Sequence, residues 1–418
     1  MKGTETMTLQ QDSLRATSPI QDSPVNQKIS AREQMEALNP EAKKLQFWIR
    51  TQKNAPAQEP WFSPVGADDS GKLASGQVAK NQLKALPYRW RWSDYRPYLD
   101  KISQISARAD VAPVEFADRQ SIVLMNPGLT ERIQVTNTIR CSISIYNPGD
   151  IAPAHVHSPN ASRTILTDNG GYTNIEGERC EARRGDVILT PNGTWHDHGN
   201  DGVEPVIWID TLDWPLMEYL DCAWVDQDYQ RTFGTAEKIQ PVKYVDGYSQ
   251  KLYSNGGLRP TFVSHQRGFS QKLTPLFHYS GVEIRNALIT LKDEEGDPYE
   301  GISMELVNPV NGESVFPTLR YGAQLLRPSE ATRFKRETSS SYFVVIQGEG
   351  YTEINGQKFD WEPNDVIAIP NFLWRRHVNT SGGDAILYTV SDATLMRNIG
   401  QYRAQGKDLE GTVIQLDL

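Results

Sequence analysis

The chain has 418 residues, a formal net charge of −9 and a hydrophobic content of 38%. This length is enough for two ordinary domains with buried cores. The acidic balance argues against a general nucleic-acid-binding or anionic-membrane surface, and no apolar run approaches the roughly 20 residues that a membrane helix needs. We therefore expect neither nucleic acid nor membrane as a partner. Three cysteines without metal-type spacing indicate reduced thiols in a cytoplasmic protein.

The N-terminal part differs in texture from the rest of the chain. Residues 1–30 are rich in Thr, Ser, Gln and Asp and lack the apolar stretch of a signal peptide, which predicts a disordered tail. Residues 31–110 are expected to form an extension of helices and loops, with helical spacing over 31–50 and a second short helix near 97–105. From 119 onward, β-branched alternation broken by Asn-Pro-Gly, Asn-Gly-Gly and Glu-Gly turns predicts an antiparallel barrel or sandwich.

The β-rich part of the chain contains an internal repeat. The sequence GYTNIEG over 171–177 returns as GYTEING over 350–356, an offset of 179 residues. The same offset matches further residues without a gap, among them Trp195 with Trp374 and His198 with His377. Two copies of one β-domain are therefore predicted, over 111–260 and 261–418.

The first copy carries four of the seven histidines in two tight pairs, His155 with His157 and His196 with His198. Residues i and i+2 of a strand point to the same face, so each pair can present two imidazoles to one barrel interior. Neutral imidazole is the commonest protein ligand for a divalent transition metal. In the second copy, His196 is matched by Arg375, and the first pair is matched by the Arg-Phe-Lys-Arg stretch over 333–336. We expect that copy to be structural or oligomerising and free of metal.

The spacing around the histidines forms two half-motifs. Gly149 is followed after five residues by His-x-His, and Gly185 is followed by five residues, Pro-x-Gly, two residues, His, three residues and Asn. This pattern resembles the paired signature of the cupin superfamily. The resemblance implies an all-β dominated bicupin, built from two tandem double-stranded β-helix (jelly-roll) barrels with an N-terminal helical extension. Cupins commonly add a Glu ligand after the second His, where this chain has Ala161 and Ser162.

A bicupin with three ligand histidines in the first barrel and none in the second is similar to the gentisate 1,2-dioxygenase family, which includes salicylate and 1-hydroxy-2-naphthoate dioxygenases. The segments LPYRW over 86–90, NPGL over 126–129 and WID over 208–210 are also similar to family segments. The resemblance spans about 40–404. It implies a non-haem Fe(II) enzyme that cleaves an aromatic 2-hydroxy-carboxylate such as gentisate with O₂, and a homotetramer.

The resemblance also implies roles for individual residues. The iron ligands would be His155, His157 and His196, although His198 shares a face with His196 and is the alternative ligand. The groups around the substrate are, by the same resemblance, Arg163 and Arg119 on the carboxylate, Trp208 on the pocket wall, and the catalytic pair His198 and Asp210. In that pair the carboxylate would orient the imidazole, which would accept the proton of the substrate hydroxyl.

Several positions depart from the family pattern, namely Val156, Arg140, Ser142, Ser144 and Gly193. They leave the ligand set intact and bear on the substrate, so salicylate and 1-hydroxy-2-naphthoate remain alternatives to gentisate. Arg140 either adds positive charge to the pocket or faces solvent. Two further alternatives are a non-catalytic cupin that binds a small anion and a Zn- or Mn-dependent cupin isomerase.

Overall fold

The computed structural model describes residues 84–107, 120–129, 132–168, 170–235, 238–254, 256, 258, 260–261 and 273–416. The chain divides into two compact units, 1–58 and 59–418, and every described residue belongs to the second. The tail expected over 1–30, the helix expected over 31–50 and Arg119 therefore lie outside the described residues. Within the described part, no helix is long and apolar enough to cross a membrane.

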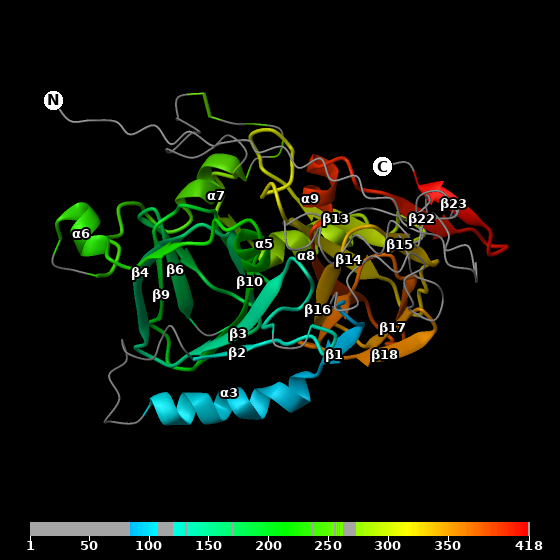
Figure 1. Cartoon of the computed structure of the whole chain (residues 1–418), viewed down its shortest axis with the longest axis horizontal. Helices are drawn as coiled ribbons and strands as arrows, with labels where there is room; N and C mark the ends of the chain where they lie inside the picture. The colour runs from blue at the N-terminus through cyan, green and yellow to red at the C-terminus, as the bar shows by residue number, and fades with distance from the viewer. Residues whose placement is uncertain are drawn as a thin grey trace, which may run out of the picture. The chain divides into compact units, whose positions relative to one another are not determined.

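Two antiparallel sheets enclose the first barrel (Figure 1). In spatial order, one sheet consists of β12 (His278–Tyr279), β8 (Val187–Thr190), β5 (Ala161–Ile165), β10 (Val206–Leu212), β3 (Arg140–Tyr146) and β2 (Ser121–Val123). The other consists of β11 (Val225–Asp226), β4 (Ile151–His157), β9 (His196–Asn200), β6 (Gly171–Ile175) and β7 (Glu178–Glu181). The Gly-rich turns expected from the sequence separate these short strands.

Two further antiparallel sheets form the second barrel. One consists, in spatial order, of β1 (Tyr88–Trp90), β19 (Val366–Ile369), β16 (Ser341–Gln347), β21 (Ala385–Ser391), β14 (Arg320–Leu326) and β13 (Ile302–Leu306). The other consists of β18 (Gln357–Trp361), β17 (Gly350–Ile354), β20 (Arg375–Asn379), β15 (Lys335–Glu337), β22 (Ala404–Lys407) and β23 (Val413–Leu416). The expected fold of two tandem barrels is confirmed. The domain limits 111–260 and 261–418 stay a prediction, and β12 and β1 each pair across them, with β8 and β19.

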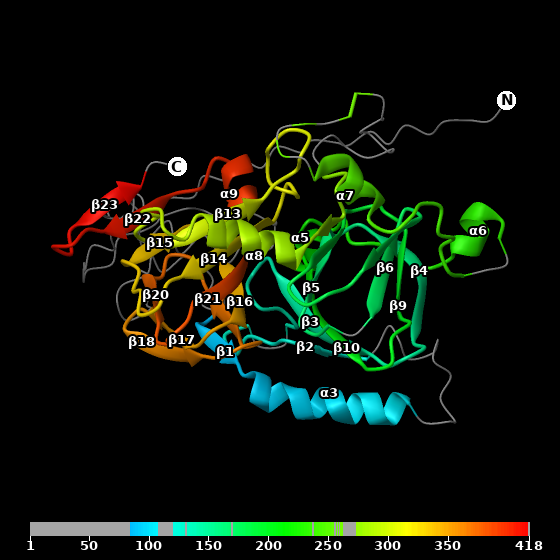
Figure 2. The same cartoon turned by 180° about the vertical axis from the view of Figure 1, so that it is seen from behind.

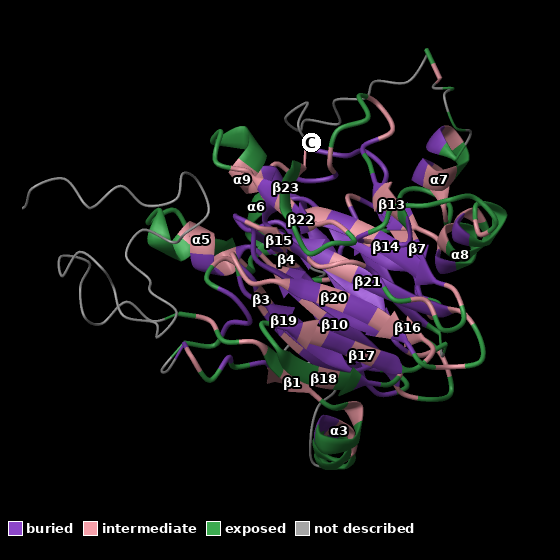
Figure 3. Cartoon of the chain, turned by 90° about the vertical axis from the view of Figure 1, so that its right-hand side faces the viewer, coloured by how far each residue is buried: buried purple, intermediate pink, exposed green. Residues whose placement is uncertain are grey.

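Six helices lie outside the sheets of the described part: α3 (Trp92–Ser106), α5 (Trp214–Tyr219), α6 (Tyr229–Phe233), α7 (Tyr248–Tyr253), α8 (Gly281–Thr290) and α9 (Ala393–Asn398). The helix expected near 97–105 is present as α3, but it begins earlier. The backbone N–H of Trp92 donates to Asp365 Oδ1 at 2.7 Å, so a carboxylate from the second barrel satisfies a free donor of the first turn. Such a cap from a distant residue leaves no local sequence signal. Figure 3 shows that the outer side of α3 is exposed.

One hydrophobic core joins the two barrels. Alternate residues of β3, Cys141, Ile143 and Ile145, are fully buried in the same cluster as Tyr342 and Val344 of β16. Figure 2 shows β3, β5 and β10 next to β14, β16 and β21. Because side chains alternate along a strand, the intervening residues of β3 face the interior of the first barrel. The inter-barrel core thus fixes the wall that carries Arg163 and Asp210, on β5 and β10.

Two buried carboxylates reinforce this junction. Asp392, at the start of α9, accepts hydrogen bonds from Thr138 Oγ1 at 2.6 Å and Ser340 Oγ at 2.8 Å. Asp213, which follows β10, accepts from the backbone N–H of Asn160 at 2.8 Å and from Thr318 Oγ1 at 2.5 Å. Each carboxylate binds one donor from either barrel, so the barrels are held by directional contacts as well as by apolar packing.

The second barrel has charged residues where the first has histidines. Lys335 lies opposite Arg375 in the ladder, as His155 lies opposite His196. Lys335 therefore corresponds to His155 at an offset of 180, one more than the offset found downstream. The 333–336 alignment from the sequence is close but its register is one residue out. The start of β6 follows the start of β5 by 171 − 161 = 10 residues, whereas the start of β17 follows the start of β16 by 350 − 341 = 9.

These charges neutralise one another. Lys335 Nζ lies 3.0 Å from Glu300 Oε1 and 2.8 Å from Glu337 Oε1. Arg375 Nη2 lies 2.7 Å from the same Glu300 oxygen and 3.5 Å from Glu337 Oε2. Burial by itself would raise the pKa of Glu337, but Lys335 and Arg375 hold it at about 2. Cations at two of the three expected ligand positions repel a metal ion, which supports the expectation of a metal-free barrel.

His377, the repeat partner of His198, predicts a pH-dependent contribution to stability. Burial, assisted by Arg375 and opposed by Glu300, lowers its pKa to about 3. Between that value and about pH 6.5 the unfolded chain binds the proton that folded His377 does not, so stability falls as the pH falls through this window. We expect His377→Asn to lose less thermal stability between pH 7 and pH 5 than the wild type.

Differential scanning calorimetry at the two pH values measures this difference. Thr352→Val is the matched control, because it removes the 2.8 Å contact between Thr352 Oγ1 and His377 Nδ1 while the imidazole stays in place. The control should lose stability at both pH values and keep the wild-type pH dependence. An equal loss in the wild type and in His377→Asn contradicts the assignment.

Candidate functional site

Four imidazoles meet inside the first barrel. β4 and β9 run antiparallel, and His155 lies directly opposite His196. The ring centroid of His196 lies 4.3 Å from that of His155, 4.8 Å from that of His157 and 5.4 Å from that of His198. His157, His196 and His198 are buried, and His155 is partly buried. The two pairs that the sequence places on neighbouring strands are thus brought together.

Three of the rings share one hydrogen-bond pattern. The Nδ1 atom lies 3.0 Å from Pro153 O in His155, 2.8 Å from Pro159 O in His157 and 2.8 Å from Thr194 O in His196. A carbonyl oxygen can only accept, so each Nδ1 carries the proton and each Nε2 presents its lone pair. Nε2 of His196 is fully buried and has no hydrogen-bond partner within the described part of the chain. An orphaned buried nitrogen of this kind fits a metal ion.

His198 is held differently. Its Nε2 lies 2.8 Å from Arg163 Nη2, and its Nδ1 lies 3.0 Å from Thr173 Oγ1. Because a guanidinium only donates, His198 Nε2 accepts and Nδ1 carries the proton. Distance gives another grouping, since ligand atoms of His155, His196 and His198 all lie within 4.8 Å of one another. Distance therefore favours His198 as the third ligand, whereas hydrogen bonding favours His157.

Arg163 occupies the centre of the polar network beside the histidines. Its side chain is buried, with Nη1 2.5 Å from Thr190 Oγ1 and Nε 3.2 Å from Asp210 Oδ1. Asp210 also accepts from Ser144 Oγ at 2.5 Å and from Trp208 Nε1 at 3.1 Å.

The direct pairing of His198 with Asp210 expected from the sequence is therefore wrong, because Arg163 lies between them. Arg163 and Asp210 are directly opposite on β5 and β10. His198 comes from the other sheet of the barrel. Arg163 bridges the two sheets by donating to His198 and pairing with Asp210.

Burial sets the charges of the site. It lowers the pKa of His157 to about 3, with His155 and Arg163 adding to the effect. It also lowers the pKa values of His196 and His198 well below the usual range. The imidazoles of His157, His196 and His198 are therefore neutral at pH 7, as metal binding requires. Burial raises the pKa of Asp210 although Arg163 opposes it, so the carboxylate depends on this arginine for its negative charge.

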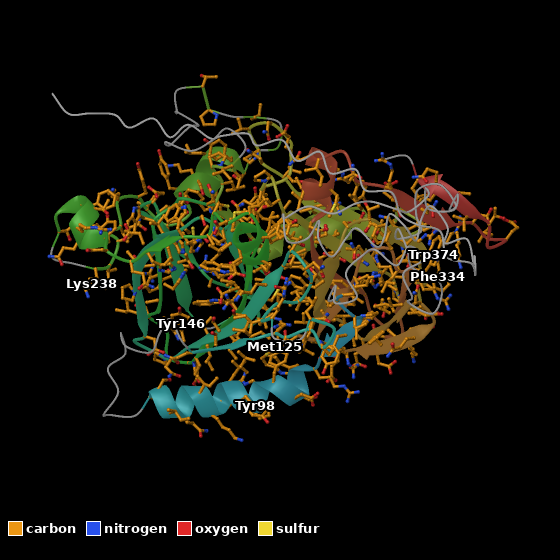
Figure 4. The ribbon with its side chains drawn as sticks, in the orientation of Figure 1. Tyr98, Met125, Tyr146, Lys238, Phe334 and Trp374 are labelled. Atoms are coloured by element: carbon orange, nitrogen blue, oxygen red, sulfur yellow. The ribbon has the colours of Figure 1, made fainter. Side chains whose placement is uncertain are left out.

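The remaining predicted residues have different outcomes. Trp208 is 1% exposed and stacks on Tyr146, with ring centroids 4.6 Å apart. Its ring centroid lies 6.0 Å from that of His198, so Trp208 packs next to this histidine. Tyr146 is labelled in Figure 4. Arg119 lies outside the described residues, and its substrate role stays a prediction.

Two threonines of this network, Thr173 and Thr190, were not expected from the sequence. Thr173 contacts Nδ1 of His198, and Thr352 makes the same contact with His377 in the second barrel. Both threonines lie in the repeated GYT segment, so comparison of the two copies contained the signal. Thr190, which accepts from Arg163, lies outside this repeated segment, so comparison of the two copies contained no signal for it.

Comparison with known proteins agrees with this geometry. A family model described as a cupin domain matches residues 142–212 and 324–391, one segment in each barrel. The chain is 34% identical over 342 residues to the 5-aminosalicylate 1,2-dioxygenase of Comamonas sp, which covers 80% of this chain and 85% of that relative. It is 30% identical over 327 residues to gentisate 1,2 dioxygenase 1 of Aquipseudomonas alcaligenes, covering 78% of this chain and 88% of that relative.

A solved structure matches as well. The salicylate 1,2-dioxygenase of Pseudoaminobacter salicylatoxidans, in its adducts with gentisate, superimposes with a TM-score of 0.69 at 27% identity. The match covers 79% of this chain and 87% of that chain. Fold, histidine cluster and similarity along most of both sequences agree. The chain belongs to the gentisate 1,2-dioxygenase family of bicupin ring-cleaving dioxygenases.

Proposed function

We propose that the chain binds Fe(II) through His155, His157 and His196 and cleaves the ring of an aromatic 2-hydroxy-carboxylate, with gentisate as the substrate. The observation that carries this proposal is the shared pattern in which a backbone carbonyl holds each Nδ1 and directs Nε2 inward. No aspartate or glutamate joins the histidine cluster within the described residues. Three neutral donors leave the ion its full charge, which favours an anionic chelating substrate.

Arg163 is proposed to bind the substrate carboxylate, together with Arg119. A buried guanidinium beside the metal ligands provides a planar fork for a carboxylate. In the structure this fork is directed to Thr190 and His198. When the carboxylate takes over these donors, the lone pair of His198 Nε2 becomes available.

That release gives His198 its proposed catalytic role. With its Nδ1 held by Thr173, the imidazole accepts the proton of the substrate hydroxyl at Nε2. Asp210 acts by keeping Arg163 in place. Bound iron would make the hydroxyl more acidic and bring substrate and O₂ together. The bond between the carboxyl-bearing and hydroxyl-bearing ring carbons breaks, and both atoms of O₂ enter the product.

Salicylate-like substrates are the second candidate. The relatives with this fold include enzymes named for 5-aminosalicylate and salicylate as well as for gentisate, and another is named for 1-hydroxy-2-naphthoate. All four of these compounds carry a carboxylate next to a ring hydroxyl. The histidine and arginine arrangement recognises that shared pair of groups, so the remote ring substituents must be read by other residues.

We also propose a cytoplasmic homotetramer. Tyr98 and Ile105 of α3 are 61% and 54% exposed, and they line a cavity of about 480 Å³ with Tyr88 and Ile122. Figure 4 labels Tyr98 on this helix. An apolar surface of this kind supports association of the chain with its own copies. Cys141, Cys180 and Cys222 form no disulfide within the described part of the chain, which fits a reducing compartment.

The proposed ligand set predicts which histidine substitutions reduce the iron content of the protein. After anaerobic loading with Fe(II), His157→Ala and His196→Ala should lose most of the bound iron, because each removes one of three donors. His198→Ala should keep iron close to the wild-type ratio and lose turnover of gentisate. Metal content by mass spectrometry and O₂ uptake with an electrode measure the two properties separately.

His377→Ala is the matched control, because His377 holds the repeat position of His198 in the second barrel and should affect neither property. Loss of iron in His198→Ala with retention in His157→Ala contradicts the proposed set and assigns the site to His155, His196 and His198.

Arg163 predicts a change in substrate binding that is independent of metal content. Arg163→Lys keeps the charge but lacks the two-pronged donor geometry, so KM for gentisate should rise about tenfold or more. Iron content should stay at the wild-type level. Initial rates of O₂ uptake over a range of gentisate concentrations give KM. An unchanged KM shows that Arg163 does not hold the carboxylate, and wild-type failure to oxidise any hydroxybenzoate or hydroxynaphthoate contradicts the substrate class.

A further inference from the structure

Arg140 is a half-buried cation whose side chain has no hydrogen-bonding partner among the described residues. Its guanidinium carbon lies 6.0 Å from the ring centroid of Trp214, at the limit of a cation–π contact. Within the described part of the chain, no group accepts a hydrogen bond from its side chain and no carboxylate lies within ion-pair distance. Burial lowers its pKa, and Glu218 only partly opposes this effect. Its hydrogen-bond donors are therefore unused in a place that is partly shielded from water.

Glu218 attracts this cation but does not form an ion pair with it. Its Oε1 accepts a hydrogen bond from Trp214 Nε1 at 2.5 Å, which fixes the indole ring. The residue before this ring, Asp213, is anchored by Asn160 and Thr318. The ring beside Arg140 is thus held by hydrogen bonds, while no described residue takes up the donors of the arginine.

Arg140 lies at the same end of the barrel as the histidine cluster. β3 begins at Arg140 where β10 ends at Leu212, and Leu212 also pairs with Ala161, the first residue of β5. A loop of three residues joins Ala161 to His157, so the end of β4 belongs to this same rim. The ladder therefore places Arg140 on the same rim of the barrel as the end of β4, which carries His155 and His157.

The side chain also shares a face with the site. Arg140, Ser142 and Ser144 alternate along β3, and Ser144 Oγ donates to the Asp210 carboxylate that pairs with Arg163. Ser142 lies opposite Asp210, and Arg140 lies two residues farther toward the rim, a step of about 7 Å. An extended arginine side chain covers a distance of that order. Ala161, on the same rim, has only a methyl group to occupy the space between.

We propose that Arg140 is a second anion-binding residue of the active site, which recognises a carboxylate or similar acceptor on the part of the substrate ring remote from the chelating groups. This inference rests on the proposed function. A ring that chelates a metal through neighbouring carboxylate and hydroxyl groups directs its opposite carbons away from the metal, toward the rim. Arg140 should therefore strengthen the binding of 2-hydroxybenzoates with an additional anionic substituent, and it donates to the remote hydroxyl of gentisate as a neutral, weaker acceptor.

Binding to the anaerobic Fe(II)-loaded protein tests this inference without turnover. The probes are 2-hydroxybenzoate, 4-hydroxybenzene-1,3-dicarboxylate and 2-hydroxybenzene-1,4-dicarboxylate, which share the chelating pair and differ in the second carboxylate. Calorimetric titration gives Kd for each. The wild type should bind at least one dicarboxylate more tightly than 2-hydroxybenzoate, and Arg140→Gln should lower this preference about tenfold, the loss expected for one charge-assisted contact.

Two control variants separate recognition from net charge and from packing. Arg140→Lys keeps the charge and should retain part of the preference. Arg285→Gln makes the same charge change at an exposed position of α8 and should leave the preference at the wild-type value. Equal preference in the wild type and Arg140→Gln overturns the inference, as does an equal loss in Arg285→Gln.

The outcome is distinguishable from failure of the proposed function. If 2-hydroxybenzoate binds the iron-loaded wild type and Arg140→Gln changes no ratio, only the role of Arg140 is overturned. If none of the three probes binds the wild type, the substrate class itself fails and the inference fails with it.

Discussion

The antiparallel register of β4 and β9 is the constraint on which the site depends. It places His155 opposite His196, and the two-residue periodicity of a strand then brings His157 and His198 to the same interior. A shift of one residue in either strand would turn its histidines to the outside. The ladder irregularity between Ala152 and His155 belongs to this arrangement. On the outward face, Ala154 and Val156 of β4 are buried with Trp195 and Tyr229 in one apolar cluster, which stabilises this register.

The two barrels use one scaffold for two electrostatic solutions. The first holds neutral imidazoles, so a bound metal ion would supply the positive charge among them. Arg163 is the cation beside these imidazoles. The second places Lys335 and Arg375 at equivalent positions and balances them with Glu300 and Glu337. A buried ion-pair group of this kind adds little net stability, because the cost of removing the charges from water offsets their attraction. It does remove the donors that a metal needs, so divergence of a few residues separates a reactive barrel from a supporting one.

The fold and the histidine cluster could be predicted from the sequence because both depend on short-range patterns. Strand alternation, glycine turns and the repeat predicted two barrels, and His-x-His spacing predicted that the four rings converge. Contacts between sheets were less accessible. The Asp210–His198 pair was expected from resemblance, but the ladder sets Asp210 against Arg163. The offset of 180 for Lys335 and the cap of α3 by Asp365 depend on a loop length and on a distant carboxylate, which no local pattern records.

The most direct test of the account is the identity of the groups around the metal. An anaerobic crystal of the Fe(II)-loaded protein, measured on both sides of the iron absorption edge, gives the iron position in an anomalous difference map. The account predicts one iron within bonding distance of Nε2 of His155, His157 and His196, with no carboxylate attached and none in the second barrel. Iron bound by His198 in place of His157, or by an aspartate or glutamate, would contradict it.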